Sequence, residues 1–170
     1  MKKIVLNILL LTTLPVLAMA SAGHNDHGKS PAAEAGMNHD MHGEAHASMA
    51  GKPGDPAKVN RVVEISMDDS MRFTPNAINV KAGETIRFFI KNNGKLTHEM
   101  VIGSMEELKE HAEMMRSMPD MKHAEANMIT LAAGKRGGIV WQFDTSGAVD
   151  FACLVPGHME AGMTGKVLVE

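Results

Sequence analysis

The chain has 170 residues, with 17 Lys and Arg, 20 Asp and Glu and a formal net charge of −3. This length predicts one domain, or two at most. The near-neutral balance lacks the concentrated basic face that nucleic-acid binding needs, so we expect no nucleic-acid partner. The single Cys excludes an intrachain disulfide and any zinc site that needs two thiolates. Sixteen Met residues are far above ordinary usage and need an explanation.

Residues 1–20 have the pattern of a secretory signal peptide. Two lysines precede a mostly apolar run over residues 4–17, and Ala18-Met19-Ala20 supplies small residues at the positions that a signal peptidase reads. The alternative is a transmembrane anchor, which needs about 20 apolar residues, more than this run contains. We therefore expect cleavage before Ser21, export to the periplasm, and a mature chain without a membrane span.

The next segment, residues 21–58, contains no Leu, Ile, Val, Phe or Trp. Such a segment cannot bury enough apolar surface to offset the entropy cost of ordering, so we predict a disordered arm. Its His and Met residues are the side chains that bind soft and borderline metal ions. They are His24, His27, Met37, His39, Met41, His42, His46 and Met49. The alternative is a solvated low-complexity linker in which these residues have no role.

From residue 59 onward the pattern changes to short apolar stretches separated by Gly, Pro and Asn. In the first of them Val63, Ile65 and Met67 alternate with polar residues, as in a half-buried strand. Strands are predicted at 61–67, 71–73, 77–80, 85–91, 97–102, 128–131, 138–143, 149–153 and 165–169. Many short strands with turns between them favour an antiparallel β-sandwich over residues 59–170.

Residues 103–127 interrupt the strands with a Met-rich insert that we predict to be helical. Ser104 and Glu107 match a helix capping box, and Pro119 limits the helix at its far end. The face formed by Met105, Leu108, Ala112 and Met115 would pack on the sandwich, with Met filling irregular gaps. Met114, Met118 and Met121 are left over, and a second metal-binding or partner surface is the alternative use for them.

The stretch from 151 to 163 carries the strongest chemical signal. Cys153, His158 and Met163 are spaced C-x4-H-x4-M on one loop between two predicted strands, and Pro and Gly residues allow that loop to turn sharply. A thiolate, two imidazoles and a weak axial thioether form the ligand set of a blue-copper centre. The second imidazole must come from elsewhere in the chain, and His98, at the start of a predicted strand, can supply it.

With His98, this loop resembles the type 1 copper site of the cupredoxins, and the run from Phe73 to Thr85 is similar to the start of that family's domain. The resemblance implies a Greek-key β-sandwich and one type 1 copper held by His98, Cys153, His158 and Met163. The His- and Met-rich arm and insert are most similar to the CopI-like periplasmic copper-tolerance members. Glu99 and Leu154 differ from many electron-carrier cupredoxins, which have Asn and a small hydroxyl residue there.

Three other interpretations of the loop compete with copper. Each residue taken singly could be structural, because a buried Cys behaves as a small hydrophobe. Zinc could bind the thiolate and two imidazoles, but an axial thioether adds nothing for zinc. A Cys nucleophile with a His base would leave Met163 without a role. Four residues of the right types together favour copper.

The sequence thus predicts an exported, monomeric copper-binding protein rather than an enzyme, with oxidation of cuprous ion as the one activity left open. One hypothesis is copper tolerance, in which the type 1 site acts with further copper bound weakly by the arm. The other is an electron carrier that exchanges electrons with a redox partner through His158. An electron carrier has no need of the arm, which favours tolerance.

Overall fold

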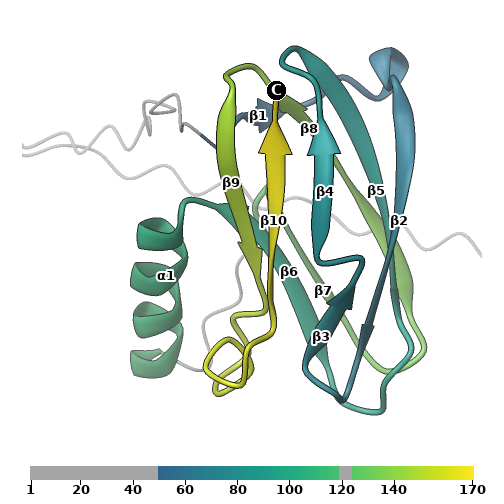
Figure 1. The fold of residues 1–170 in the computed structure, drawn as a ribbon. Coiled ribbons are helices and arrows are strands. Elements are labelled where there is room, and N and C mark those ends of the chain that lie inside the picture. Colours follow the sequence, from purple (N-terminus) through teal and green to yellow (C-terminus); the bar gives the residue numbers. More distant parts are fainter. Residues whose placement is uncertain (1–49, 119–123) are drawn as a thin grey trace, which may run out of the picture. The chain divides into compact units, whose positions relative to one another are not determined.

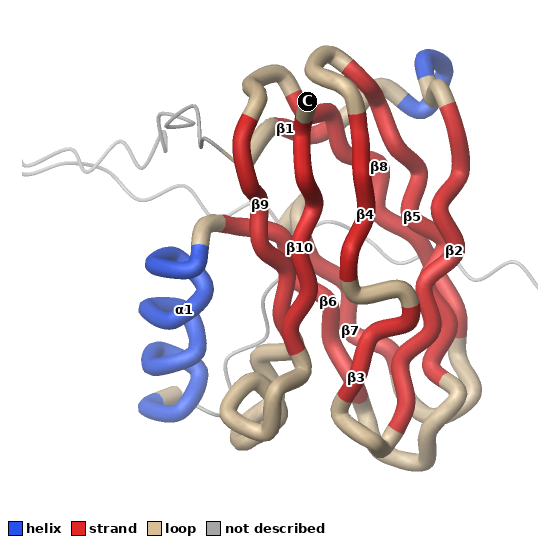
Figure 2. Tube along the Cα trace, in the orientation of Figure 1, coloured by secondary structure: helices blue, strands red, loops and turns tan. Residues whose placement is uncertain are grey.

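A computed structural model describes residues 50–118 and 124–170, which form two five-stranded sheets and one α-helix (Figures 1 and 2). The predicted signal peptide, most of the predicted arm, and Met121 lie outside the described residues. The strands are β1 (Lys52–Pro53), β2 (Arg61–Asp68), β3 (Arg72–Thr74), β4 (Ala77–Val80), β5 (Glu84–Asn92), β6 (His98–Gly103), β7 (Met128–Leu131), β8 (Arg136–Phe143), β9 (Gly147–Ala152) and β10 (Thr164–Val169). The helices are the 3-10 turn η1 (Pro56–Lys58) and the α-helix α1 (Met105–Ser117).

The two sheets pack face to face, which confirms the predicted β-sandwich. Their strand orders are β1-β8-β5-β2-β3 and β4-β10-β9-β6-β7. Along β5, residues 86, 88, 90 and 92 are buried and residues 87, 89 and 91 are exposed, as expected for a strand with one face on the core. Phe88 and Phe143 meet edge to face in that core, and so do Phe73 and Phe151.

The sequence predicts an antiparallel sandwich, but two of the strand pairs are parallel. β2 runs parallel to β5, and β4 runs parallel to β10. The reason is that β4 belongs to the opposite sheet from β3 and β5, so the chain crosses between sheets and β5 returns beside β2. Alternation of side chains along a strand carries no information about such a crossing.

The predicted boundary of the arm at residue 58 is wrong, because residues 50–58 already belong to the ordered domain. β1 pairs with β8, and the indole Nε1 of Trp141 donates a hydrogen bond to the carbonyl oxygen of Ala50 at 2.7 Å. Gly51 has φ of +102°, and a Cβ there would lie 2.3 Å from the carbonyl oxygen of Gln142. Backbone pairing orders this segment, and composition alone does not reveal it.

Helix α1 begins as predicted, with the Ser104 hydroxyl accepting from the Glu107 amide and the Glu107 carboxylate accepting from the Ser104 amide. Leu108 and Ala112 are buried against β6 and β9, while Met115 is half-buried. Met118 is 40% exposed. At the far end of α1, Arg116 forms an ion pair of 2.6 Å with Glu160 of the β9–β10 loop.

Candidate metal centre

The side chains predicted as metal ligands lie at the start of one strand and on the loop that follows a neighbouring strand of the same sheet. His98 is the first residue of β6, and Cys153 directly follows β9, which pairs with β6. His158 and Met163 lie on the β9–β10 loop. Figure 1 shows that this loop, the β2–β3 turn and the β5–β6 turn lie at the same end of the sandwich. Strand pairing therefore joins His98 to a loop that is 55 residues away in the chain.

His98, Cys153 and His158 converge in the structure. One nitrogen of each His and the Cys sulfur lie within 4.8 Å of one another. The Cys153 Sγ is 3.3 Å from the His158 Nδ1, and the two imidazole centroids are 4.9 Å apart. Cys153 and His98 are fully buried, and His158 is 9% exposed. Among the described residues, no other group of His, Cys, Asp and Glu side chains converges in this way.

Met163 lies in the same buried cluster as Cys153 and is itself fully buried. The backbone of the loop holds these residues together: the Cys153 amide donates to the Met163 carbonyl, and the Met163 amide donates to the His158 carbonyl, each at 3.0 Å. These hydrogen bonds hold Cys153, His158 and Met163 on one compact loop. The role of Met163 as axial ligand remains a prediction.

The Cys153 sulfur accepts a hydrogen bond from the Glu99 amide at 3.3 Å. Because this donor is a backbone N–H, the Glu side chain at position 99 does not remove it. Burial raises the pKa of the Cys153 thiol to about 11, partly opposed by that hydrogen bond, and the Glu99 charge acts in the same direction as burial. Burial also lowers the pKa of His158, with His98 contributing. Burial therefore favours the uncharged forms of the Cys153 thiol and the His158 imidazole.

The donors fit a copper ion. The Nδ1 of His98 is buried without a hydrogen-bond partner, which is unusual for a polar atom in a protein interior and is explained by a metal at that atom. A thiolate, two imidazoles and a nearby thioether are soft and borderline ligands, the set that copper prefers. Cys153 would bind the metal as a thiolate, with its proton released to solvent. These residues are thus chemically suited to hold copper.

Sequence reasoning missed one residue at this centre. Asp69, in the turn after β2, places its Oδ1 3.2 Å from the Nε2 of His98. No local motif marks this residue, because the contact spans 29 positions and depends on the pairing of β2 with β5. An aspartate in a predicted turn is by itself an ordinary turn residue.

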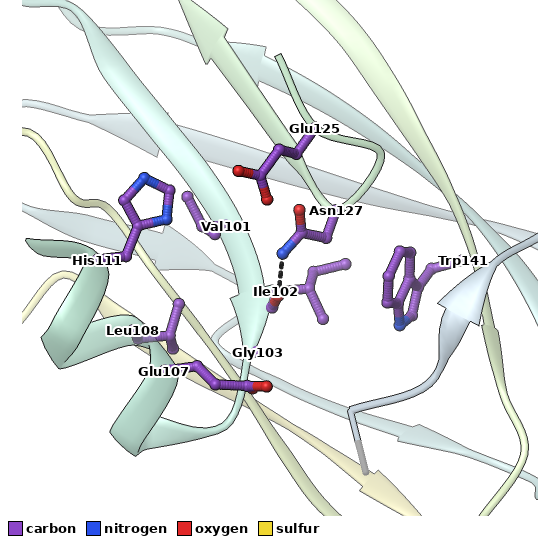
Figure 3. A pocket seen from close by; sticks show the side chains of 9 residues that line it. All are labelled: Val101, Ile102, Gly103, Glu107, Leu108, His111, Glu125, Asn127 and Trp141. Atoms are coloured by element: carbon purple, nitrogen blue, oxygen red, sulfur yellow. Dashed lines mark hydrogen bonds between the residues drawn. The ribbon is translucent and has the colours of Figure 1, made fainter. Parts of the chain in front are cut away.

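A cavity of about 240 Å³ next to α1 is separate from this centre (Figure 3). Its polar lining includes Glu107, His111, Glu125 and Asn127. Asn127 donates to the Ile102 carbonyl at 2.8 Å, and Glu107 caps the helix. The Asn127 and Glu107 side chains thus make hydrogen bonds that stabilise the fold. None of the four predicted ligands lines the cavity.

Comparison with known proteins decides the family. The model of the copper-binding proteins of the plastocyanin/azurin family matches residues 58–170. The chain belongs to this family, the cupredoxins. Copper is accordingly its cofactor, as the Cys–His–His cluster indicates.

Two curated relatives of this cupredoxin are each named copper-resistant cuproprotein CopI. The one from Rubrivivax gelatinosus is 49% identical over 152 residues, which cover 89% of this chain and 87% of the relative. The one from Vibrio cholerae serotype O1 is 35% identical over 98% of both chains. Among solved structures, auracyanin B superposes with a TM-score of 0.60 at 20% identity, over 71% of this chain and 96% of its own. The last likeness concerns the fold alone.

The part of the cupredoxin that the structure describes contains no helix that is long and apolar enough to cross a membrane.

Proposed function

We propose that this cupredoxin is exported to the periplasm, holds one type 1 copper at His98, Cys153, His158 and Met163, and contributes to copper tolerance by binding copper and cycling it between Cu(II) and Cu(I). The observation that carries the proposal is the buried convergence of the His98, Cys153 and His158 ligand atoms within 4.8 Å. The two relatives named as copper-resistant cuproproteins support tolerance as the biological role. The pattern of residues 1–20 supports export.

A soluble electron carrier is the second candidate. Among the four proposed ligands, His158 alone is measurably exposed, at 9%, whereas the others are fully buried. An electron could therefore enter or leave through this imidazole. This alternative requires a redox partner protein, whereas tolerance requires only copper ions.

The site is tested by loading the protein with Cu(II) and recording its visible spectrum. In the wild type we expect the intense absorption band of thiolate-to-copper charge transfer. Cys153→Ala should abolish it, and His158→Ala should abolish it or replace it with a different spectrum. Met163→Leu should shift the band, while Met118→Leu, which changes an exposed Met, should leave it unchanged. A wild-type-like band in Cys153→Ala would overturn the assignment.

The biological role is tested by growth in excess copper. A strain that lacks the gene should grow poorly, and the wild-type gene should rescue it while the Cys153→Ala gene should not. If the deletion strain tolerates copper as well as its parent but loses an electron-transfer activity, the carrier function replaces tolerance.

A further inference from the structure

Asp69 contacts the metal centre through the His98 imidazole, and backbone amides of the β5–β6 turn hold its carboxylate in place. The amide of Lys95 lies 2.8 Å from Oδ2 and 3.0 Å from Oδ1, and the amide of Leu96 lies 3.1 Å from Oδ1. Gly94 leaves room for this contact, because a Cβ there would lie 2.1 Å from Oδ1. The β5–β6 turn thus orients the carboxylate independently of its contact with His98.

The turn that holds Asp69 is itself anchored in the fold. The buried side chain of Asn92 donates to the carbonyl oxygens of Leu96 at 2.7 Å and of Leu131 at 2.9 Å. The amide of Asn93 donates to the Met67 carbonyl at 2.7 Å, which ties the turn to β2. The position of Asp69 next to His98 is therefore a rigid feature.

An ionised carboxylate accepts hydrogen bonds and cannot donate them. The amides of Lys95 and Leu96 both donate to the oxygens of Asp69, so this carboxylate acts as an acceptor in the structure. The Nε2 of His98 must then carry the proton in the 3.2 Å contact, which leaves the lone pair on Nδ1. Nδ1 is the buried atom without a hydrogen-bond partner. Asp69 thus selects the tautomer that can bind a metal.

The charge of Asp69 also distinguishes the two oxidation states. Cu(II) with one thiolate and two neutral imidazoles carries one net positive charge, and Cu(I) with the same ligands carries none. The Asp69 carboxylate brings the total to zero for Cu(II) and to minus one for Cu(I). Because a net charge is costly in a largely buried site, the carboxylate stabilises the oxidised state. Asp69 is 36% exposed, and solvent screens part of this effect.

We propose that Asp69 is a positioning residue of the copper centre, which fixes the His98 tautomer and, by its charge, favours Cu(II) over Cu(I). This inference rests on the copper site proposed above. It explains why an acidic residue from a distant turn is directed at a buried imidazole.

The test measures the Cu(II) affinity, the Cu(I) affinity and the reduction potential of the copper site in three variants. Asp69→Asn keeps an oxygen that can accept the turn amides and the His98 proton but loses the charge, and Asp69→Ala loses both. Asp68→Asn is the matched control, since it removes the neighbouring charge, which bonds with Ser70 rather than with His98. We expect Asp69→Asn to lower the Cu(II) affinity at least about tenfold and the Cu(I) affinity less. Each tenfold change in their ratio raises the reduction potential by about 59 mV.

A metal-free measurement tests the tautomer separately. Nitrogen-15 NMR of the wild type should show the His98 proton on Nε2 alone, and Asp69→Ala should show a mixture with the Nδ1–H form. A wild-type proton on Nδ1, or equal shifts of potential in Asp69→Asn and Asp68→Asn, would overturn the inference. So would equal losses of Cu(II) and Cu(I) affinity in Asp69→Asn, which indicate a structural role alone. Absence of the charge-transfer band from the wild type would instead overturn the copper site itself.

Discussion

At the scale of single residues, the metal centre is defined by how burial changes the chemistry of Cys153. In water a thiol of ordinary pKa, near 8.5, is about one quarter ionised at pH 8. With its pKa raised to about 11, the Cys153 thiol is about one thousandth ionised at that pH. Without a metal, the proposed thiolate ligand is therefore a protonated thiol of low reactivity.

This difference leads to a prediction for the metal-free protein. Native Cys153 should react with a thiol-specific disulfide reagent at pH 8 at least about 100-fold more slowly than the urea-unfolded chain, because the thiolate reacts and its fraction is low. The rate should keep rising with pH up to about 11, whereas that of the unfolded chain should level off above its ordinary pKa. The measurement is the release of the reagent's chromophore over time. Equal native and unfolded rates at pH 8 would contradict the prediction.

At the scale of elements, α1 is connected to the centre at both ends. Its first residues follow β6, the strand that supplies His98, and its last turn contacts the β9–β10 loop through the Arg116–Glu160 ion pair. Between them, Leu108 and Ala112 pack on Val101, Ala152 and Leu154, the last two of which flank Cys153 in sequence. The insert thus covers the sheet next to the centre, which gives its buried apolar residues a structural role.

The capping box makes this helix testable by one substitution. Ser104→Ala removes the hydroxyl that accepts from the Glu107 amide, and it should lower the free energy of unfolding by about 1 kcal/mol. Ser117→Ala, at the exposed far end, should have a smaller effect, because its hydroxyl bonds to a carbonyl within the helix. Urea unfolding of the metal-free protein measures both. A larger loss in Ser117→Ala would show that the cap does not stabilise α1.

At the scale of the whole molecule, the domain and the His- and Met-rich segment before it have different roles in our proposal. The structure sets the domain's start no later than Ala50, because β1 pairs with β8 and Trp141 bonds to Ala50. Copper capture by residues 21–49 stays a prediction from composition. A truncation that tests it must spare residues 50–58, since these belong to the sandwich.

Deletion of residues 21–49 from the mature chain should lower the total copper bound per chain while leaving the charge-transfer band unchanged. The reason is that the His and Met side chains of that segment would bind copper without a thiolate. Copper is counted by metal analysis after equilibrium dialysis. A matched variant in which the five His of the segment are replaced by Asn keeps its length. If wild type and truncated chain both bind one copper, the segment does not capture copper.

The sequence by itself determined the strands from β2 to β10, the helix with its capping box, and the loop that carries Cys153, His158 and Met163. These features depend on neighbouring residues: alternation of apolar side chains, a cap three positions from its partner, and donors spaced along one turn. The need for a second imidazole indicated His98 as a further candidate ligand, and the family resemblance agreed with that choice.

Only the tertiary structure decided what depends on distant segments. It placed His98 against the loop through the β6–β9 pairing, ran β2 parallel to β5, and brought residues 50–53 onto β8. It also added Asp69 to the centre. Backbone hydrogen bonds and packing fix these contacts. The types of the residues that are joined do not reveal which distant segments will pair. The excess of Met that marked the sequence is thus partly explained, by the core and by the proposed ligand Met163, through positions that composition alone could not assign.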